Sequence, residues 1–292
     1  MSKNVAEAIV LVALMVLPLL AFSPQSIHSA RPMIPVPPSP QTAAVVAASN
    51  CPLPSAQCSA SFNWGGYAVT GPTKSVTDVK GSWEVPTIVG AVGPNCPDKE
   101  VTYYDVANWV GIDGFSSSTV EQIGTASDCY YGQVQYYAWY EFFPLAGVII
   151  SHAIYPGDSM NAEVKWVSGN TFTLSIQDTT AGHTWSFSHT GSVSGALRNS
   201  AQWITETGAA CVGTSCTLLV LLALTDYTSV KYSDCYATVS GMTEQISGFG
   251  SNVQWIEMVN LNFPSAPGIR AKPSALTMGG TSFTVEFVSS GP

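Results

Sequence analysis

The chain has 292 residues, of which only 10% are charged, and its formal net charge is −9. An ordinary soluble domain carries about 25% charged residues, so this chain has unusually few. A protein that binds nucleic acid presents a basic patch. Because the net charge here is negative, we expect neither nucleic acids nor anionic membrane surfaces as partners. Full protonation in acid would leave at most 14 positively charged side chains, 10 from Lys and Arg and 4 from His. Repulsion between so few charges would unfold the protein only weakly. This composition is therefore compatible with a protein that works in acid and with a neutral extracellular domain.

The first predicted element is a signal peptide, residues 1–30. Lys3 precedes an apolar run over 8–22 that Pro18 interrupts. The run is short for a membrane span, which needs about 20 apolar residues, and is typical of a cleaved secretory signal. We therefore expect a secreted, extracellular protein with no membrane attachment after cleavage between residues 23 and 30.

A Pro-rich segment follows over residues 31–60 and is typical of an extended linker or a pro-segment. Ordered sequence is expected from residue 61 to residue 292, as one domain. The oxidising compartment favours disulfides, although pairing cannot be read from sequence. Local spacing favours Cys211 with Cys216 and Cys51 with Cys58, and Cys96 with Cys129 could close a longer loop, which leaves Cys235 over.

Short runs rich in Val, Thr, Tyr, Phe and Trp recur between turn signals through the rest of the chain. Many of them alternate with period two, which is typical of half-buried strands. We predict strands at 81–86, 134–143, 160–166, 171–176, 184–188, 200–206 and 282–288. Residues 217–225 are apolar throughout and are predicted to form one fully buried strand. The even spacing indicates a single all-β sandwich.

Several hydrolase schemes are disfavoured. The sequence has no G-x-S-x-G elbow, because Val193 stands where the nucleophile belongs, and it has no H-E-x-x-H motif. No Cys/His spacing suggests zinc, and we expect no metal and no cofactor. Carboxylates remain: alternation places Glu206 on one face with Ile204, and Glu141 on one face with Tyr137 and Trp139.

Seven segments, in this order, resemble the glutamic peptidases of the eqolisin type, peptidase family G1. The matching segments are 63–67 (NWGGY), 83–86 (WEVP), 109–114 (WVGIDG), 122–124 (QIG), 138–141 (AWYE), 157–158 (GD) and 201–206 (AQWITE). The likeness runs from about residue 61 to the C-terminus. It implies a concanavalin A-like sandwich of two curved antiparallel sheets, whose concave face forms the substrate cleft.

The resemblance also implies an acid-acting endopeptidase on protein or peptide substrates. It places the catalytic glutamine at Gln122 and the catalytic glutamate at Glu206, 84 positions later (206 − 122). Trp109, Asp113, Trp139 and Glu141 fall on surrounding positions that bind substrate or orient the pair. For Asp113, capping the turn before Gly114 is the alternative. We expect a monomer.

A carbohydrate-binding or glycoside-hydrolysing β-sandwich is the main alternative, and a non-catalytic surface protein is the third. A retaining glycosidase needs two carboxyl groups about 5–5.5 Å apart. Glu121 and Glu141 are possible partners for Glu206, but Glu121 is adjacent to Gln122 and should point to the opposite face. Gln202 and Trp203, beside Glu206, differ from the better-known fungal members of the family.

Overall fold

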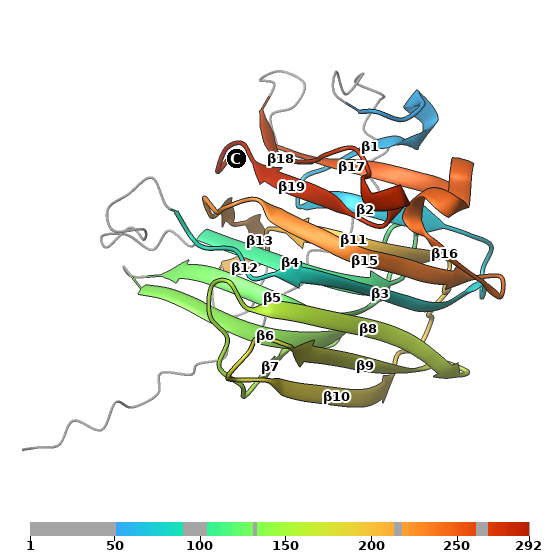
Figure 1. The fold of residues 1–292 in the computed structure, drawn as a ribbon, viewed down its shortest axis with the longest axis horizontal. Helices are drawn as coiled ribbons and strands as arrows, with labels where there is room; N and C mark the ends of the chain where they lie inside the picture. The colour runs from blue at the N-terminus through green and yellow to red at the C-terminus, as the bar shows by residue number, and fades with distance from the viewer. Residues whose placement is uncertain (1–50, 90–103, 131–132, 213–217, 261–267, 292) are drawn as a thin grey trace, which may run out of the picture. The chain divides into compact units, whose positions relative to one another are not determined.

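The computed structural model describes residues 51–89, 104–130, 133–212, 218–260 and 268–291 (Figure 1). All of them belong to one unit, Pro32–Pro292. Their regular structure consists of strands and three short 3-10 helices. The strands are β1 Cys58–Ser61, β2 Trp64–Thr70, β3 Val76–Glu84, β4 Tyr104–Ile112, β5 Val120–Tyr130, β6 Gln133–Phe143, β7 Val148–Ile150, β8 Ser159–Ser168, β9 Thr171–Asp178, β10 Trp185–Ser192, β11 Ser200–Glu206, β12 Ala209–Val212, β13 Leu218–Leu221, β14 Ala223–Leu224, β15 Val230–Val239, β16 Met242–Gln245, β17 Val253–Val259, β18 Ile269–Pro273 and β19 Phe283–Phe287, and the helices are η1 Ser55–Gln57, η2 Ile246–Asn252 and η3 Met278–Gly280. None of these helices is long and apolar enough to cross a membrane.

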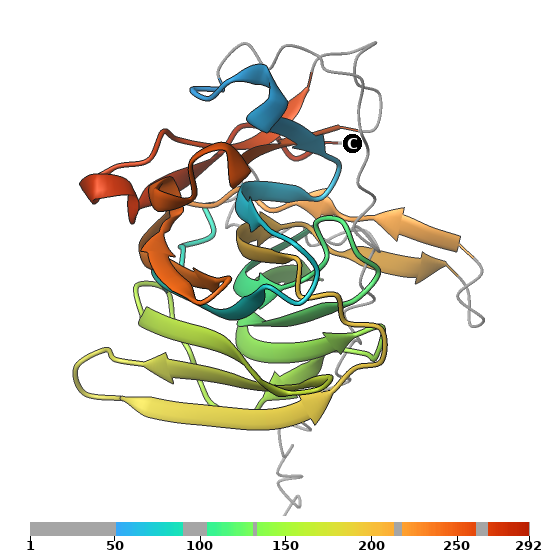
Figure 2. The same cartoon turned by 90° about the vertical axis from the view of Figure 1, so that its right-hand side faces the viewer.

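Apart from β12 and β13, which pair only with each other, the strands form two stacked layers (Figures 1 and 2). The first runs β1-β17-β2-β11-β4-β5-β6-β7, and the second runs β19-β15-β3-β8-β9-β10. β3 and β8 pack against β4, and β9 packs against β5. β18 pairs with β17 and with β19 and thereby joins the sheets along one edge. The predicted all-β sandwich is confirmed; β1–β17 and β14–β4 are parallel exceptions to its antiparallel pairing.

The central strands β2, β11 and β4 of the first sheet are buried on both faces, and all seven residues of β11 are buried. Side chains alternate along a strand. Ala201 and Trp203 therefore enter the main core between the sheets. Ile204 instead joins a second apolar cluster with Trp109 and Trp139 on the other face, here called the outer face of the first sheet. Alternation thus carries Glu206 to this outer face as well.

The prediction of one continuous buried strand over residues 217–225 is wrong. The described part of the segment is two short strands, β13 and β14, separated at Leu222. The Leu222 N–H donates to the Gly208 carbonyl, and its own carbonyl accepts from Arg270 and Thr207. These bonds take Leu222 out of the ladder, and Leu221 to Ala223 are only half-buried.

The predicted Cys51–Cys58 disulfide is present. Residues 55–57 and 58–61 form η1 and β1, so ordered structure reaches into the Pro-rich segment. Cys129 is also disulfide-bonded, while Cys96 and Cys216 lie outside the described residues. Cys235 is buried with a free thiol.

Candidate active site

Five of the predicted site residues share the outer face of the first sheet. Trp109 on β4 and Trp139 on β6 belong to one apolar cluster. Gln122 on β5 is the register partner of Glu141 on β6, and Glu206 ends β11. Four neighbouring strands therefore bring together residues that are far apart in the sequence.

Glu206 is held by two N–H donors. The indole Nε1 of Trp109 donates to Oε2 at 2.8 Å, and Nδ2 of Asn63 donates to Oε1 at 2.9 Å. The ring of Trp64 stands edge-on to that of Trp109, with centroids 5.1 Å apart. Burial raises the pKa of Glu206 to about 8, against the opposing effect of these indole and amide groups. The carboxyl group is thus fixed in orientation and only 6% exposed.

Gln122 is oriented by Glu141. Its Nε2 donates to Oε2 of Glu141 at 2.6 Å, and the side chain is 3% exposed. Burial raises the pKa of Glu141 well above its usual value, and the charge of Glu206 acts in the same direction. Glu141 thereby fixes the amide, whose Oε1 is buried and has no hydrogen-bond partner among the described residues.

Two glycines let the indole of Trp109 lie across this face. A Cβ at Gly124, the register partner of Trp109, would lie 2.2 Å from the carbonyl oxygen of Asn108 and 2.6 Å from the Cβ of Trp109. A Cβ at Gly111 would come within 2.9 Å of the ring carbon Cζ3. The glycines in the 109–114 and 122–124 segments thus have a steric reason, because they permit the ring position from which Nε1 reaches Glu206.

Gly124→Ala should therefore displace β4 at Asn108 and Trp109 and destabilise the fold by about 1–3 kcal/mol, the usual cost of overpacking. The measurement is the free energy of unfolding in urea. Gly65→Ala is the matched control, because a Cβ there meets its nearest atoms at 3.6 Å, an ordinary contact. Equal stability of the two variants would show that Trp109 does not need the glycine.

Comparisons with known proteins identify the family of the chain. Residues 62–263, more than half of the chain, match the model of the Peptidase A4 family. The chain belongs to this family. Its members include the eqolisins, or glutamic peptidases, which the sequence motifs indicated.

Two relatives in the Peptidase A4 family are fungal proteins. Aspergillopepsin-2 from Aspergillus niger is 30% identical over 196 residues, which are 63% of this chain and 66% of that protein. Scytalidopepsin B from Scytalidium lignicola is 31% identical over 141 residues, 46% of this chain and 51% of that protein. The match thus spans between half and two thirds of these relatives.

The eqolisin fold is also found by structural comparison. Scytalido-glutamic peptidase with a transition state analog inhibitor superposes with a TM-score of 0.62, 23% identity, and coverage of 78% of this chain and 98% of that one. The eqolisin SCP-B in a complex with the tripeptide Ala-Ile-His gives a TM-score of 0.58 at 23% identity and the same coverage. The shared fold is that of the sandwich described above.

Asp113, the sixth predicted residue, lies just after β4 and has a positive φ of 69°. Its carboxylate accepts the backbone N–H groups of Leu197 and Arg198 at 2.8 Å and of Asn199 at 3.0 Å. Asp113 therefore holds the loop that leads into β11. It orients the strand of Glu206 from outside the group formed by Gln122, Glu141 and Glu206.

The motifs did not assign Asn63, a ligand of Glu206, to the site, although the 63–67 segment contains it. They also missed Asp105 and Asp128, which face each other across β4 and β5. The pair could have been predicted from the register of the β4–β5 hairpin, because the turn between the two strands sets that register. Glu121 lies on the core side, where its register partners Ile112 and Phe142 also lie.

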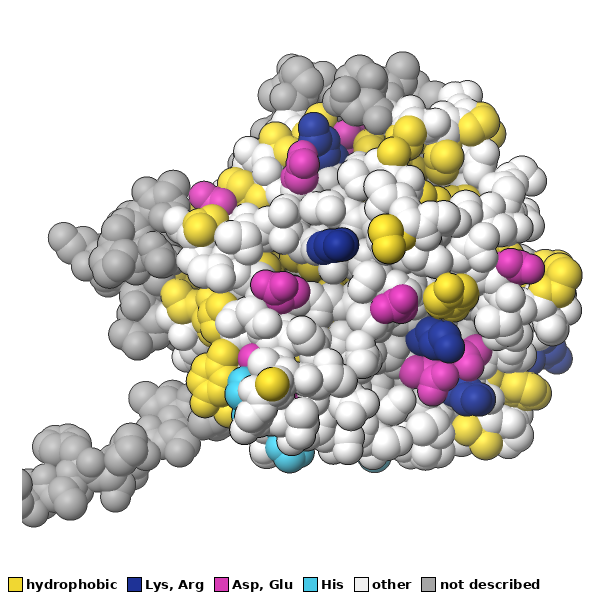
Figure 3. Space-filling model, viewed as in Figure 1, with side chains coloured by type: hydrophobic (Ala, Val, Ile, Leu, Met, Phe, Trp, Pro, Cys, Tyr) yellow, Lys and Arg dark blue, Asp and Glu magenta, His cyan; other side chains and the backbone are white. Residues whose placement is uncertain are grey.

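A groove of about 690 Å³ lies on the other side of the sandwich, over the second sheet (Figure 3). Its lining includes uncharged polar residues such as Ser82, Asn161 and Gln177. At one end Nζ of Lys80 lies 5.7 Å from the ring centre of Tyr236. None of the predicted site residues lines this groove.

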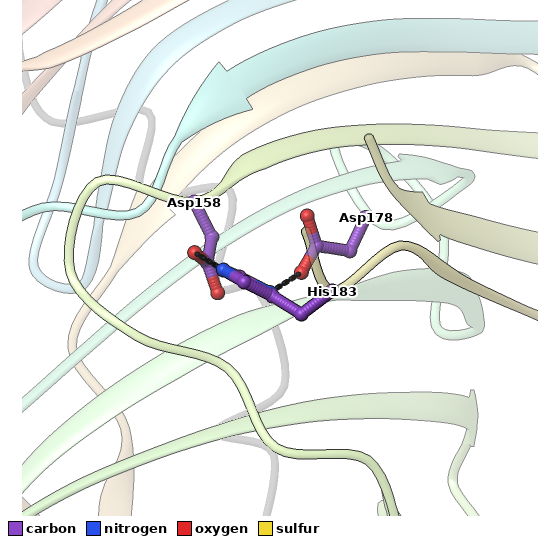
Figure 4. A group of neighbouring side chains, drawn as sticks. All are labelled: Asp158, Asp178 and His183. Carbon is purple, nitrogen blue, oxygen red and sulfur yellow. Dashed lines mark hydrogen bonds and ion pairs between the residues drawn. The ribbon is translucent and has the colours of Figure 1, made fainter. Parts of the chain in front are cut away.

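One further cluster of titratable groups ties two loops together (Figure 4). Asp158, Asp178 and His183 offer ligand atoms within 4.8 Å of one another. The imidazole lies between the carboxylates, at 3.4 Å from Asp158 and 3.2 Å from Asp178. The Tyr155 and Thr180 N–H groups occupy the remaining carboxylate oxygens. These contacts link the loop before β8 to the loop after β9.

Proposed function

We propose that the chain is an endopeptidase in which Glu206 and Gln122 cleave peptide bonds together. The observation that carries the proposal is the position of the Glu206 carboxyl group, which Trp109 and Asn63 hold on the face that also presents the Glu141-oriented amide of Gln122. The solved relatives bind a transition state analog and a tripeptide. Peptides and proteins are therefore the proposed substrates.

The chemistry requires a base and an oxyanion donor. Ionised Glu206 takes a proton from water as the water attacks the scissile carbonyl carbon. The free N–H of Gln122 donates to the oxygen that becomes negative. Glu206 then returns the proton to the leaving nitrogen when the C–N bond breaks. An amide does not titrate in the working range, so Gln122 keeps its function in acid.

Action in acid requires the outer face to open. At 6% exposure Glu206 has a pKa of about 8 and is protonated in acid. Contact with water would reverse the desolvation that raises this pKa. We propose that the substrate enters an opened face. Residues 1–30 are proposed as the signal of a secreted monomer.

Digestion of a denatured protein substrate across pH 2–7 tests the function, with pepstatin present and absent. We expect wild type to cleave regardless of pepstatin, and Glu206→Gln to lose cleavage by about 10²–10⁴-fold, the usual contribution of a general base. Glu244→Gln, at an exposed position on β16, is the matched control. Equal activity of Glu206→Gln and wild type, or cleavage of polysaccharide without proteolysis, would overturn the proposal.

A further inference from the structure

Asp105 and Asp128 lie directly opposite each other on two strands of the candidate site. They are register partners on β4 and β5, a position that puts Cβ atoms about 4.5–5.5 Å apart. Asp105 is 3% exposed. Two ionised carboxylates at this spacing repel each other. The neighbouring Asp128 carboxyl group lowers the pKa of Asp105 as a hydrogen-bonding group. It can do so only while it carries a proton, because an ionised carboxylate can only accept.

The pair is tied to the strand that carries Glu206. Oδ2 of Asp105 accepts the Gly208 N–H at 2.6 Å, two residues beyond Glu206. A Cβ at position 208 would lie 2.7 Å from that oxygen, so glycine permits the close approach. On the other side, the Tyr137 hydroxyl donates to Oδ2 of Asp128 at 2.9 Å. Asp105 thereby fixes the end of β11.

The pair also acts on Glu206 through its charge. Ala107 is the register partner of Glu206, and Asp105 lies two residues before Ala107 on the same face. A negative charge on Asp105 opposes ionisation of Glu206.

The other charged groups near Asp105 and Glu206 come from β18 and β6. Arg270 on β18 is fully buried and attracts the charge of Asp105, while its N–H groups donate to the carbonyls of Phe62, Leu222 and Ser290. Glu141 on β6 interacts with Glu206. The charge of the aspartate pair is therefore felt at the proposed base.

We propose that Asp105 and Asp128 share one proton and act as a positioning pair for Glu206. The shared proton limits the pair to one negative charge and bridges β4 and β5. It also holds the Asp105 carboxylate where it accepts the Gly208 N–H. Loss of this proton adds a second negative charge beside Glu206 and separates the two carboxylates. Activity then falls at high pH. This inference rests on the proposed peptidase function.

Asp128→Asn tests the pair, because an amide supplies a permanent N–H donor to Asp105 in place of the shared proton. We expect the alkaline limb of kcat/KM to move up by about one pH unit or more, with the maximum within about threefold of wild type. Asp105→Asn removes the charge next to Glu206 and should move the acidic limb to lower pH. A merely structural role would lower activity without moving either limb.

The thermal midpoint against pH gives a second reading that does not depend on catalysis. Wild type should lose stability as the pair loses its proton, and Asp128→Asn should lose less over the same range. Glu244→Gln is the control for removal of a carboxyl group elsewhere. If the pH profile of kcat/KM and the thermal midpoints of Asp128→Asn both superimposed on those of wild type, the proposal of a shared proton would be overturned. Wild type without peptidase activity would instead overturn the proposed function, and the midpoints would still decide whether the proton is shared.

Discussion

Gln122→Ala should lower kcat/KM by about 10²–10³-fold, the cost of one missing oxyanion donor. Most of the loss should lie in kcat, because the oxyanion forms only in the transition state. The variant should still fold, although it leaves Oε2 of Glu141 without the amide that now donates to it. That unpaired oxygen should cost about 1–3 kcal/mol of stability.

Two further variants separate the amide's chemistry from its packing. Gln122→Glu keeps the shape but replaces the amide with a carboxyl group that can donate only while protonated, so any activity it retains should disappear as the pH rises. Gln177→Ala, at an exposed position on β9 of the other sheet, is the matched control. Activity of Gln122→Ala near the wild-type value, with equal amounts of folded protein, would remove Gln122 from the mechanism.

The folded protein should be more stable near pH 4 than near pH 8. Burial raises the pKa of Glu206 to about 8 and that of Asp78 to about 6, and it also raises the pKa of Asp105, Glu121 and Glu141. Folding therefore favours the neutral form of these groups. Their contribution is fully present below the ordinary carboxyl values near 4 and is lost as the pH rises through the folded-state values.

Glu206 is one large contributor to the expected change. A pKa near 8 in the folded chain, against 4.5 for a free glutamate, corresponds to about 5 kcal/mol lost between pH 4 and 8. Urea unfolding at a series of pH values measures it. Glu206→Gln should flatten the curve by a large part of that amount, whereas Glu244→Gln should leave it unchanged. A free energy of unfolding that rises between pH 4 and 8 would contradict the burial described for these carboxyl groups.

Alternation and motif order predicted much of the fold and part of the site. The period-two pattern predicted that Glu141 and Trp139 share a face, and the boundaries of β11 agree with the predicted 200–206 strand. Such features depend only on local geometry, because successive side chains of a strand point to opposite sides. The roles carried over from the family for Gln122 and Glu206 stay predictions.

The contacts between distant segments could not be predicted. Asn63 reaches Glu206 across 143 positions, and Asp113 reaches the 197–199 loop across about 85. These contacts depend on which strands pair and in what register, and single strand patterns do not contain that information. The break at Leu222 also depends on distant segments, because its N–H donates to the Gly208 carbonyl and its carbonyl accepts from Arg270.

The position of β4 between β5 and β11 has a consequence for how the chain acquires activity during folding. β5 follows β4 in the sequence and can pair with it early, but β11 must return from a distant part of the chain to pair with the other side of β4. Closing such a long loop is slow compared with forming a hairpin. A chain in which β4 and β5 have paired but β11 has not would hold Gln122 without Glu206 beside it, and it would therefore lack the proposed catalytic pair.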